Sequence, residues 1–410
     1  MGRGALHIGS RYQRSVCAGV SGIFGVAEII RLEGHTMRLR SFVMMLVVAL
    51  LSVVAGAQSN GGSKSPGVWT FAVSGDSRNC GDVVMPAIAE SATKHSPKFY
   101  WHLGDLRAIY DLDEDIRMRP EYQPGGSKGP LSVSAYESMA WPDFIENQIK
   151  AWGPVPFMVG IGNHETVAPM KNRHDFLIQF ADWLNAPIVQ QQRLKDDPAD
   201  HAVKAYYHWI QGGVDFIYLD NATLDQFDGA QLVWFRRTLQ NAETNGDVTA
   251  VVVGMHAALP YSLASGHSMN DWPTGEQSGR AVYEALLNFR SKSGKPVYVL
   301  ASHSHFLVAN VFNSDYWKAH GGVLPGWIVG TAGAVRYALP PTAKQADKAM
   351  TNVYGYLLGT VDTSKPAPER IHFEYVQVER AEVPQSVAQR MGPALMDFCW
   401  TKNSQAFGHE

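Results

Sequence analysis

Short apolar runs alternate with amphipathic segments along most of the chain. Runs of β-branched and aromatic residues bounded by polar or turn residues predict buried strands, and apolar residues at helical spacing predict helices between them. The expected strands cover 69–73, 99–103, 157–161, 214–219, 248–253, 297–300, 326–329, 354–361 and 370–378. The expected helices cover 82–93, 135–151, 173–184, 230–240 and 279–289. This alternation is typical of an α/β sheet stack.

The domain organisation follows from the absence of repeats and of strong linkers after residue 66. We therefore expect one catalytic domain over 67–380, followed by a C-terminal tail over 381–410. The stretch 111–130 is rich in charge, Gly and Pro, which predicts an insertion loop. Residues 58–66 form a Gly/Ser-rich linker in front of the domain.

The segment 37–57 has the order of features of an export signal. A basic start is followed by an apolar run over 42–55 and by the small-x-small site Ala55-Gly56-Ala57. A membrane-spanning helix would need about 18 or more apolar residues, so an uncleaved anchor is the weaker alternative. A signal peptide normally starts a chain, and residues 1–36 are therefore expected to be a non-translated or disordered extension before Met37. The predicted location is exported, periplasmic or extracellular, with no membrane span after cleavage.

Composition and charge exclude several classes of protein. The chain is 45% hydrophobic and 18% charged, which favours a globular protein over a disordered one. Its net charge is −3, and no run of five Lys or Arg residues occurs, so no nucleic-acid-binding surface is expected. Two cysteines, Cys80 and Cys399, lie after the signal segment. They permit one disulfide in an oxidising compartment, and two separately buried thiols are the alternative.

Metal-ligand side chains follow several of the expected strands directly. A lone Gly-Asp is usually a turn, and a lone histidine after a strand is usually a polar residue with ordinary partners. Carboxylate, amide and imidazole groups after successive strands indicate a metal centre, because open α/β sheets place their sites at the carboxyl ends of strands. The candidate ligands are Asp76, Asp105, Asn163, His256, His303 and His305.

The motifs Gly104-Asp105, Gly162-Asn163-His164-Glu165 and His303-x-His305 resemble those of the calcineurin-like metallophosphoesterases, and within them the purple acid phosphatase-like branch. The resemblance covers residues 68 to about 305. It implies a four-layer α/β/β/α sandwich of two mixed sheets that holds two metal ions. By motif, Asp105 bridges both ions, Asp76 and His305 hold the first, and Asn163, His256 and His303 hold the second. Iron, zinc and manganese, as divalent or trivalent ions, all suit this ligand set.

The first motif departs from the family pattern. Many members have Asp-x-His, whereas this chain has Asp76-Ser77-Arg78, and a guanidinium does not ligate a metal. Purple acid phosphatases have a Tyr three residues after the bridging Asp, where Ala108 stands here; Tyr110 is a possible substitute. Arg78 is expected to hold phosphate oxygens at the site mouth, and a surface or helix-capping role is the alternative. Ser302 replaces a usual Gly.

The expected reaction is hydrolysis of a phosphate ester, in which a hydroxide bound by the two metal ions attacks phosphorus. His164 is the candidate acid for the leaving group, oriented by Glu165 or Asp111, and a structural role is its alternative. Other histidines, His267 among them, have no ligand spacing and are not candidates. The substrate is expected to be a phosphorylated small molecule or a phosphodiester, and neither ester class nor oligomeric state is predicted.

A second function fits the same residues. The missing ligand at Arg78 is compatible with a secreted binding protein that keeps the metal scaffold and has little or no turnover. Metal content combined with turnover separates this reading from the hydrolase.

Overall fold

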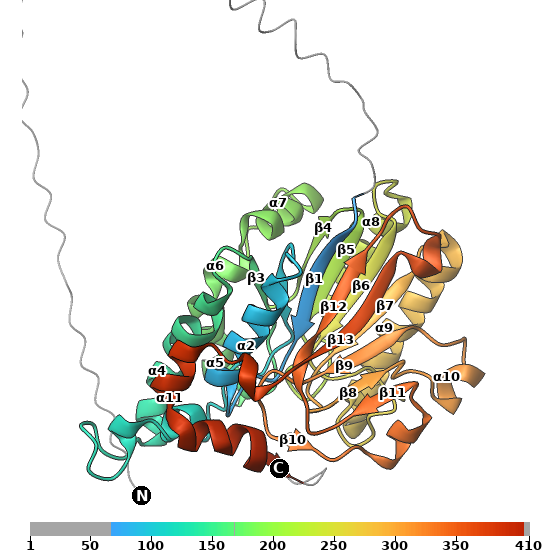
Figure 1. Cartoon of the computed structure of the whole chain (residues 1–410). Coiled ribbons are helices and arrows are strands. Elements are labelled where there is room, and N and C mark those ends of the chain that lie inside the picture. Colours follow the sequence, from blue (N-terminus) through green and yellow to red (C-terminus); the bar gives the residue numbers. More distant parts are fainter. Residues whose placement is uncertain (1–66, 168, 406–410) are drawn as a thin grey trace, which may run out of the picture. The chain divides into compact units, whose positions relative to one another are not determined.

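The computed structural model describes residues 67–167 and 169–405, which contain two mixed β-sheets (Figure 1). The five-stranded sheet has the order β13-β12-β1-β2-β3. Its strands are β1 (Trp69–Ser74), β2 (Tyr100–His102), β3 (Phe157–Val159), β12 (Tyr354–Val361) and β13 (Ile371–Val378). Strands β1, β2 and β3 are parallel, and β12 and β13 join antiparallel.

The seven-stranded sheet has the order β11-β8-β9-β7-β6-β5-β4. Its strands are β4 (Tyr207–Gln211), β5 (Val214–Leu219), β6 (Ala250–Met255), β7 (Val297–Ala301), β8 (Leu307–Ala309), β9 (Gly326–Val329) and β11 (Lys348–Met350). Strands β5, β6, β7 and β9 are parallel. Parallel strands end at one edge of their sheet, so the residues that follow them are brought together.

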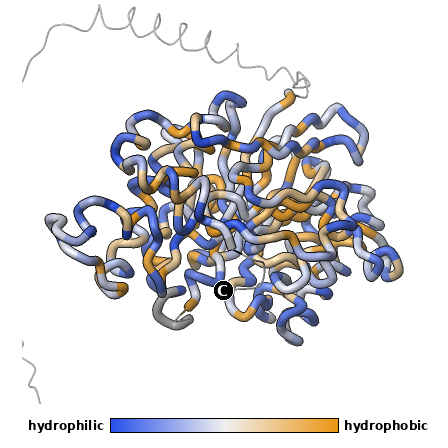
Figure 2. The backbone as a smooth tube through the Cα atoms, turned by 60° about the horizontal axis from the view of Figure 1, so that its bottom comes forward, coloured by the Kyte–Doolittle hydropathy of each residue, from blue (hydrophilic) through white to orange (hydrophobic). Residues whose placement is uncertain are grey.

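The two sheets pack face to face through aromatic side chains. The rings of Phe71 and Phe216 lie 5.0 Å apart, and those of Phe99 and Trp209 lie 5.2 Å apart. Along β5, Phe216 and Tyr218 face this inner core, whereas Ile217 and Leu219 face the outer helices, as the alternation of strand side chains requires. Figure 2 shows the hydrophobic segments concentrated inside the molecule.

Helices cover the outer face of each sheet. On the first sheet lie α2 (Gly81–Thr93) and α4 (Val133–Phe144), with α11 (Gln385–Asp397) against α2. On the second lie α8 (Gly229–Thr244) and α9 (Pro273–Ser293). The other helices are α3 (Glu114–Arg117), α5 (Pro169–Gln179), α6 (Ala181–Leu184), α7 (Pro187–Asp196) and α10 (Asp315–Ala319). The predicted four-layer α/β/β/α arrangement is confirmed (Figure 1).

Several element boundaries differ from the expectations. The helix expected over 135–151 is α-helical only to Phe144 and continues as π and 3₁₀ turns to Trp152. The helix expected over 173–184 is broken at Phe180 into α5 and α6. The insertion over 111–130 contains the short helix α3. The helix α7 was not expected, because it buries only Val189 and so lacks an apolar stripe.

Residues 381–405 fold against the domain. Cys399 follows helix α11, and its sulfur is bonded to the sulfur of Cys80. The disulfide that the two cysteines permit is therefore confirmed. Strand β14 (Ser404–Gln405) then pairs parallel with β10 (Arg336–Tyr337).

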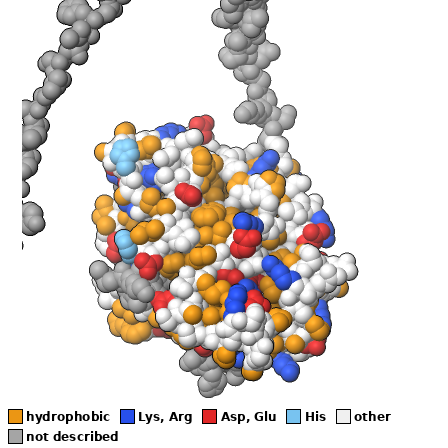
Figure 3. Space-filling model, turned by 90° about the vertical axis from the view of Figure 1, so that its left-hand side faces the viewer, with side chains coloured by type: hydrophobic (Ala, Val, Ile, Leu, Met, Phe, Trp, Pro, Cys, Tyr) orange, Lys and Arg blue, Asp and Glu red, His pale blue; other side chains and the backbone are white. Residues whose placement is uncertain are grey.

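None of the described helices is both long and apolar enough to cross a membrane. On the face shown in Figure 3, basic side chains lie among acidic ones.

Candidate metal centre

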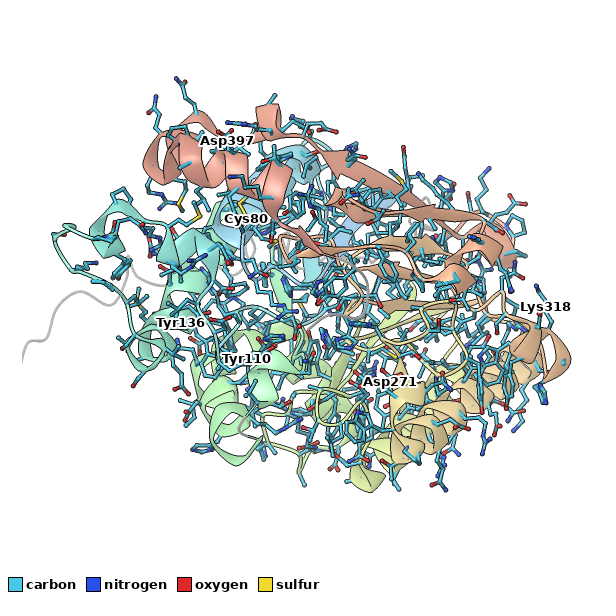
Figure 4. The ribbon with its side chains drawn as sticks, turned by 90° about the horizontal axis from the view of Figure 1, so that it is seen from below. Cys80, Tyr110, Tyr136, Asp271, Lys318 and Asp397 are labelled. Atoms are coloured by element: carbon cyan, nitrogen blue, oxygen red, sulfur yellow. A yellow bond between two sulfur atoms is a disulfide. The ribbon has the colours of Figure 1, made fainter. Side chains whose placement is uncertain are left out.

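The candidate ligands meet at the carboxyl ends of the parallel strands, the end of the molecule seen in Figure 4. Ligand atoms of Asp76, Asp105 and His305 lie within 4.8 Å of one another. Those of Asp105, His256 and His303 form a second group with the same spacing. Asp105 therefore belongs to both groups, as the bridging role expected for it requires.

Asn163 completes the cluster from the turn after β3. Its Oδ1 lies 2.9 Å from Nε2 of His256, and Nε2 of His256 lies 3.1 Å from Nδ1 of His303. The structure thus brings together every candidate ligand predicted from the sequence.

Strained backbone holds these ligands in place. Asp76, Asp105 and His303 have φ of +60°, +57° and +66°, values that cost a non-glycine residue about 1 kcal/mol or more. Gly162 lets the chain pass close to the bridging carboxylate, because a Cβ there would lie 2.2 Å from Oδ1 of Asp105. Such strain is typical of functional sites.

Hydrogen bonds select the ring nitrogens that face the cluster. Nδ1 of His256 lies 3.0 Å from the carbonyl oxygen of Leu103, which only accepts, so Nδ1 carries the hydrogen and Nε2 is left for an ion. Nδ1 of His305 likewise donates to the carbonyl of Val335 at 2.7 Å. Ser302, at the usual Gly position, has no positive φ, and its Oγ donates to the carbonyl of Leu103.

Asn221 is a supporting residue beside the candidate ligand His256. Its Oδ1 accepts from the backbone N–H groups of His256 and Ala257, and its Nδ2 donates to the carbonyl of Ala257. The side chain therefore fixes the backbone that carries His256. An Asn after a strand gives no sequence signal for this role.

Two buried carboxylate oxygens show that cations fit the cluster. Oδ1 of Asp76 and Oδ2 of Asp105 have no hydrogen-bond partner among the described residues, and both side chains are almost fully buried. A buried carboxylate oxygen without a donor is costly unless a positive charge faces it. Carboxylates, imidazoles and an amide oxygen together suit transition-metal ions.

The ionisable side chains of the cluster shift one another's pKa values. Burial alone would raise the pKa of Asp105, but the charges of His256 and His164 outweigh it and hold that pKa well below its usual value. Burial lowers the pKa of His256, yet the Asp105 carboxylate raises it to about 10. Burial together with the charge of His256 lowers the pKa of His303 to about 3. The Asp105 carboxylate is thus held in its ionised form, in which it can face a cation.

Arg78 lies at this cluster and neither lies on the surface nor caps a helix. It is 7% exposed, and its Nη2 lies 3.4 Å from Nε2 of His305 and 3.5 Å from the hydroxyl of Tyr337. Its Nε lies 3.9 Å from Oδ2 of Asp105. The guanidinium therefore stands beside the group of Asp76, Asp105 and His305.

His164 also lies at the cluster, but its expected orientation by Glu165 or Asp111 is wrong. Its Nδ1 lies 2.8 Å from the carbonyl oxygen of Ala108, and its Nε2 lies 3.7 Å from Oδ2 of Asp105. The oxygens of Glu165 accept instead from the backbone N–H groups of Gly162, Asp105 and Leu106. Glu165 therefore positions the loop that carries Asp105. The Tyr110 ring stacks on the His164 ring at 4.8 Å.

His267 and Tyr337 lie beside the candidate ligands, although neither was a candidate. The His267 ring is 5.3 Å from that of His303 and 5.2 Å from that of Tyr337. Tyr337 stacks on His305 at 4.1 Å. His267 lies in the loop after β6 and Tyr337 in the short strand β10, and no expected strand or motif covers either residue, so only the folded arrangement reveals them.

Comparison with models of protein families and with curated proteins finds no match. Among solved structures, the chain is similar to a purple acid phosphatase from yellow lupin (Lupinus luteus) seeds, with 15% identity and a TM-score of 0.48. That match covers 76% of this chain and 52% of the lupin chain, so this chain spans about half of its length.

Two other solved structures are also similar. The structure of PhoD shares 16% identity over 75% of this chain and 68% of its own, with a TM-score of 0.44. A putative 5'-nucleotidase from Staphylococcus aureus shares 15% identity over 81% of this chain and 59% of its own, with a TM-score of 0.41.

Proposed function

We propose that this protein is an exported hydrolase of phosphate esters that works with two transition-metal ions. The observation that carries the proposal is the place of Asp105 in two ligand groups, one with Asp76 and His305 and the other with His256 and His303. A shared carboxylate between two such groups suits a pair of neighbouring ions. We assign Asn163 to the second group because its Oδ1 faces His256.

Two bound ions, of iron, zinc or manganese, would neutralise the phosphate oxygens and make a water molecule acidic enough to attack at neutral pH. The chain's own residues would bind and orient the ester and supply a proton. The proposed substrate is a phosphorylated small molecule or a phosphodiester.

Arg78 would bind the phosphate group. Its planar guanidinium can donate two parallel hydrogen bonds to phosphate oxygens, and its contacts with His305 and Tyr337 hold it at the cluster. Its positive charge would oppose the charge that builds up on the oxygens during transfer. The same charge would weaken cation binding to the nearby group of Asp76, Asp105 and His305.

His164 would protonate the leaving group. The carbonyl of Ala108 accepts from Nδ1, which leaves Nε2 to hold a proton on the side of the Asp105 carboxylate. A leaving alkoxide is a strong base, and a proton donor at this place lowers the barrier to its departure.

Export is proposed from two observations. The disulfide between Cys80 and Cys399 favours an oxidising compartment, either periplasmic or extracellular. The signal features over 37–57 point the same way, and they lie outside the described residues.

The test measures metal content and turnover on the same sample. Protein purified with Mn²⁺ or Zn²⁺ is expected to hold up to two ions per chain and to hydrolyse an aryl phosphate monoester or diester. Asp105→Asn is expected to lose both metal and rate, whereas Asp315→Asn, an exposed Asp on α10, keeps both. Metal-loaded protein without turnover on either ester would favour the binding protein, and full activity of Asp105→Asn would refute the bridge.

A further inference from the structure

Four exposed apolar side chains lie on loops that follow strands leading to the candidate metal centre. Tyr110, Val167, Leu224 and Trp272 are 50%, 43%, 51% and 47% exposed. They come from the loops that follow β2, β3, β5 and β6, which include the strands followed by Asp105, Asn163 and His256. We call these four residues the apolar rim.

Ring stacking and a hydrogen bond connect the first part of the rim to the site. The Tyr110 ring lies parallel to the His164 ring, at 4.8 Å and 19°. Val167 directly follows the turn His164–Thr166, and the hydroxyl of Thr166 donates to the carbonyl of Ala222 at 2.9 Å. The loops after β3 and β5 are therefore joined next to His164.

The rest of the rim continues from this junction. Leu224 has φ of +52°, an uncommon value for a leucine. A Cβ at Gly275, in the first turn of α9, would lie 2.5 Å from the carbonyl oxygen of Asp225. Trp272, immediately before α9, therefore belongs to a loop packed against the one that carries Leu224.

Charges in these loops disfavour a leaving group with further anionic groups. Residues 220–228 and 256–272 contain no Lys or Arg, but they contain Asp220, Asp225, Asp228 and Asp271. Arg173, on α5, forms an ion pair with Asp220. A second phosphate on the substrate would meet carboxylates here and find little positive charge to balance it.

We infer that the apolar rim binds the leaving group of the ester, and that the favoured substrates carry a neutral aromatic body beyond the bond that is cleaved. This inference rests on the proposed function. Aromatic rings that stack on Tyr110 and Trp272 would lose water-exposed apolar surface, and this loss stabilises the complex. A body of this kind also avoids the carboxylates of the loops.

The test compares two esters whose leaving groups are both alkoxides. Phenethyl phosphate has an aromatic body and glycerol 1-phosphate a polar one, and each is offered to the metal-loaded protein as a monoester and as its methyl diester. We expect kcat/KM to be at least about tenfold higher for the phenethyl ester of the class that is cleaved.

Variants identify the residues responsible. Trp272→Ala and Leu224→Ser are expected to lower the phenethyl-to-glycerol ratio about tenfold, mainly through a higher KM for the phenethyl ester, since the contact exists before the reaction. Val233→Ser is the control, because Val233 is 67% exposed and lies on α8 rather than in one of these loops. It is expected to leave both rates unchanged.

The outcomes separate the two proposals. No turnover of any ester would overturn the proposed function and this inference with it. If the protein turns over the esters but the phenethyl-to-glycerol ratio of kcat/KM is near one, the inference alone is overturned. The same follows if Trp272→Ala leaves that ratio unchanged. A Trp272→Ala variant that keeps the ratio but loses binding to phosphatidylcholine vesicles or self-association would assign the rim to a membrane or a second copy and would also overturn it.

Discussion

Single ring nitrogens decide which imidazoles can bind an ion and which can carry a proton. The carbonyl of Leu103 accepts from Nδ1 of His256, and the carbonyl of Val335 accepts from Nδ1 of His305. In both rings the other nitrogen, Nε2, therefore faces the carboxylates. The carbonyl of Ala108 does the same for His164. The first two histidines belong to groups with ligand spacing, whereas His164 belongs to neither and approaches Asp105 at 3.7 Å. We therefore assign His164 to proton transfer.

This assignment predicts that His164→Ala lowers kcat about 10²- to 10⁴-fold and leaves the metal content unchanged, because the variant removes a proton donor and no ligand. Steady-state rates and elemental analysis of the same preparation check it. His95→Ala, at an exposed position after α2, should keep both values. Unchanged kcat, or loss of metal in the His164 variant, would show that this residue has another role.

At the scale of elements, the C-terminal segment braces two loops of the site. Cys399 is bonded to Cys80, which lies two residues after Arg78. The side chain of Asn403 donates to the carbonyls of Gly333 and Ala334, in the loop that continues to Tyr337. The C-terminal segment thus holds both the loop after Arg78 and the loop at Gly333 in place.

The disulfide should contribute a few kcal/mol to the free energy of unfolding, because it restricts the unfolded chain across 319 residues. A Cys80→Ala/Cys399→Ala double variant is expected to be about 2–5 kcal/mol less stable by denaturant unfolding. Full reduction should lower the stability of the natural chain and leave that of the double variant unchanged. Equal stability of oxidised natural chain and variant would contradict this role.

Over the whole molecule, the sheets could be predicted because their apolar runs are buried. The two inner faces and the outer helices cover strands such as β5 and β6 completely, so the runs stand out from polar surroundings. Surface elements give less signal. Helix α7 buries only Val189, so it was not expected.

The candidate site divides in the same way. Asp76, Asp105 and His303 could be found because each closely follows a buried strand, and parallel strands bring such residues to one end. The residues that hold these ligands in place could not be predicted from the sequence. Asn221, Tyr337 and the carbonyl of Ala108 act through backbone or ring contacts that depend on the final positions of loops, and no spacing along the chain encodes those positions.

The most direct test is a crystal structure of the protein grown with excess Mn²⁺ or Zn²⁺, with anomalous scattering recorded to locate the ions. We predict two peaks on either side of the Asp105 carboxylate, with the peak near His256 and His303 filling first, because the positive charge of Arg78 opposes the other. Peaks elsewhere, or none in contact with Asp105 at saturating metal, would contradict the shared-carboxylate site from which the proposed hydrolysis follows.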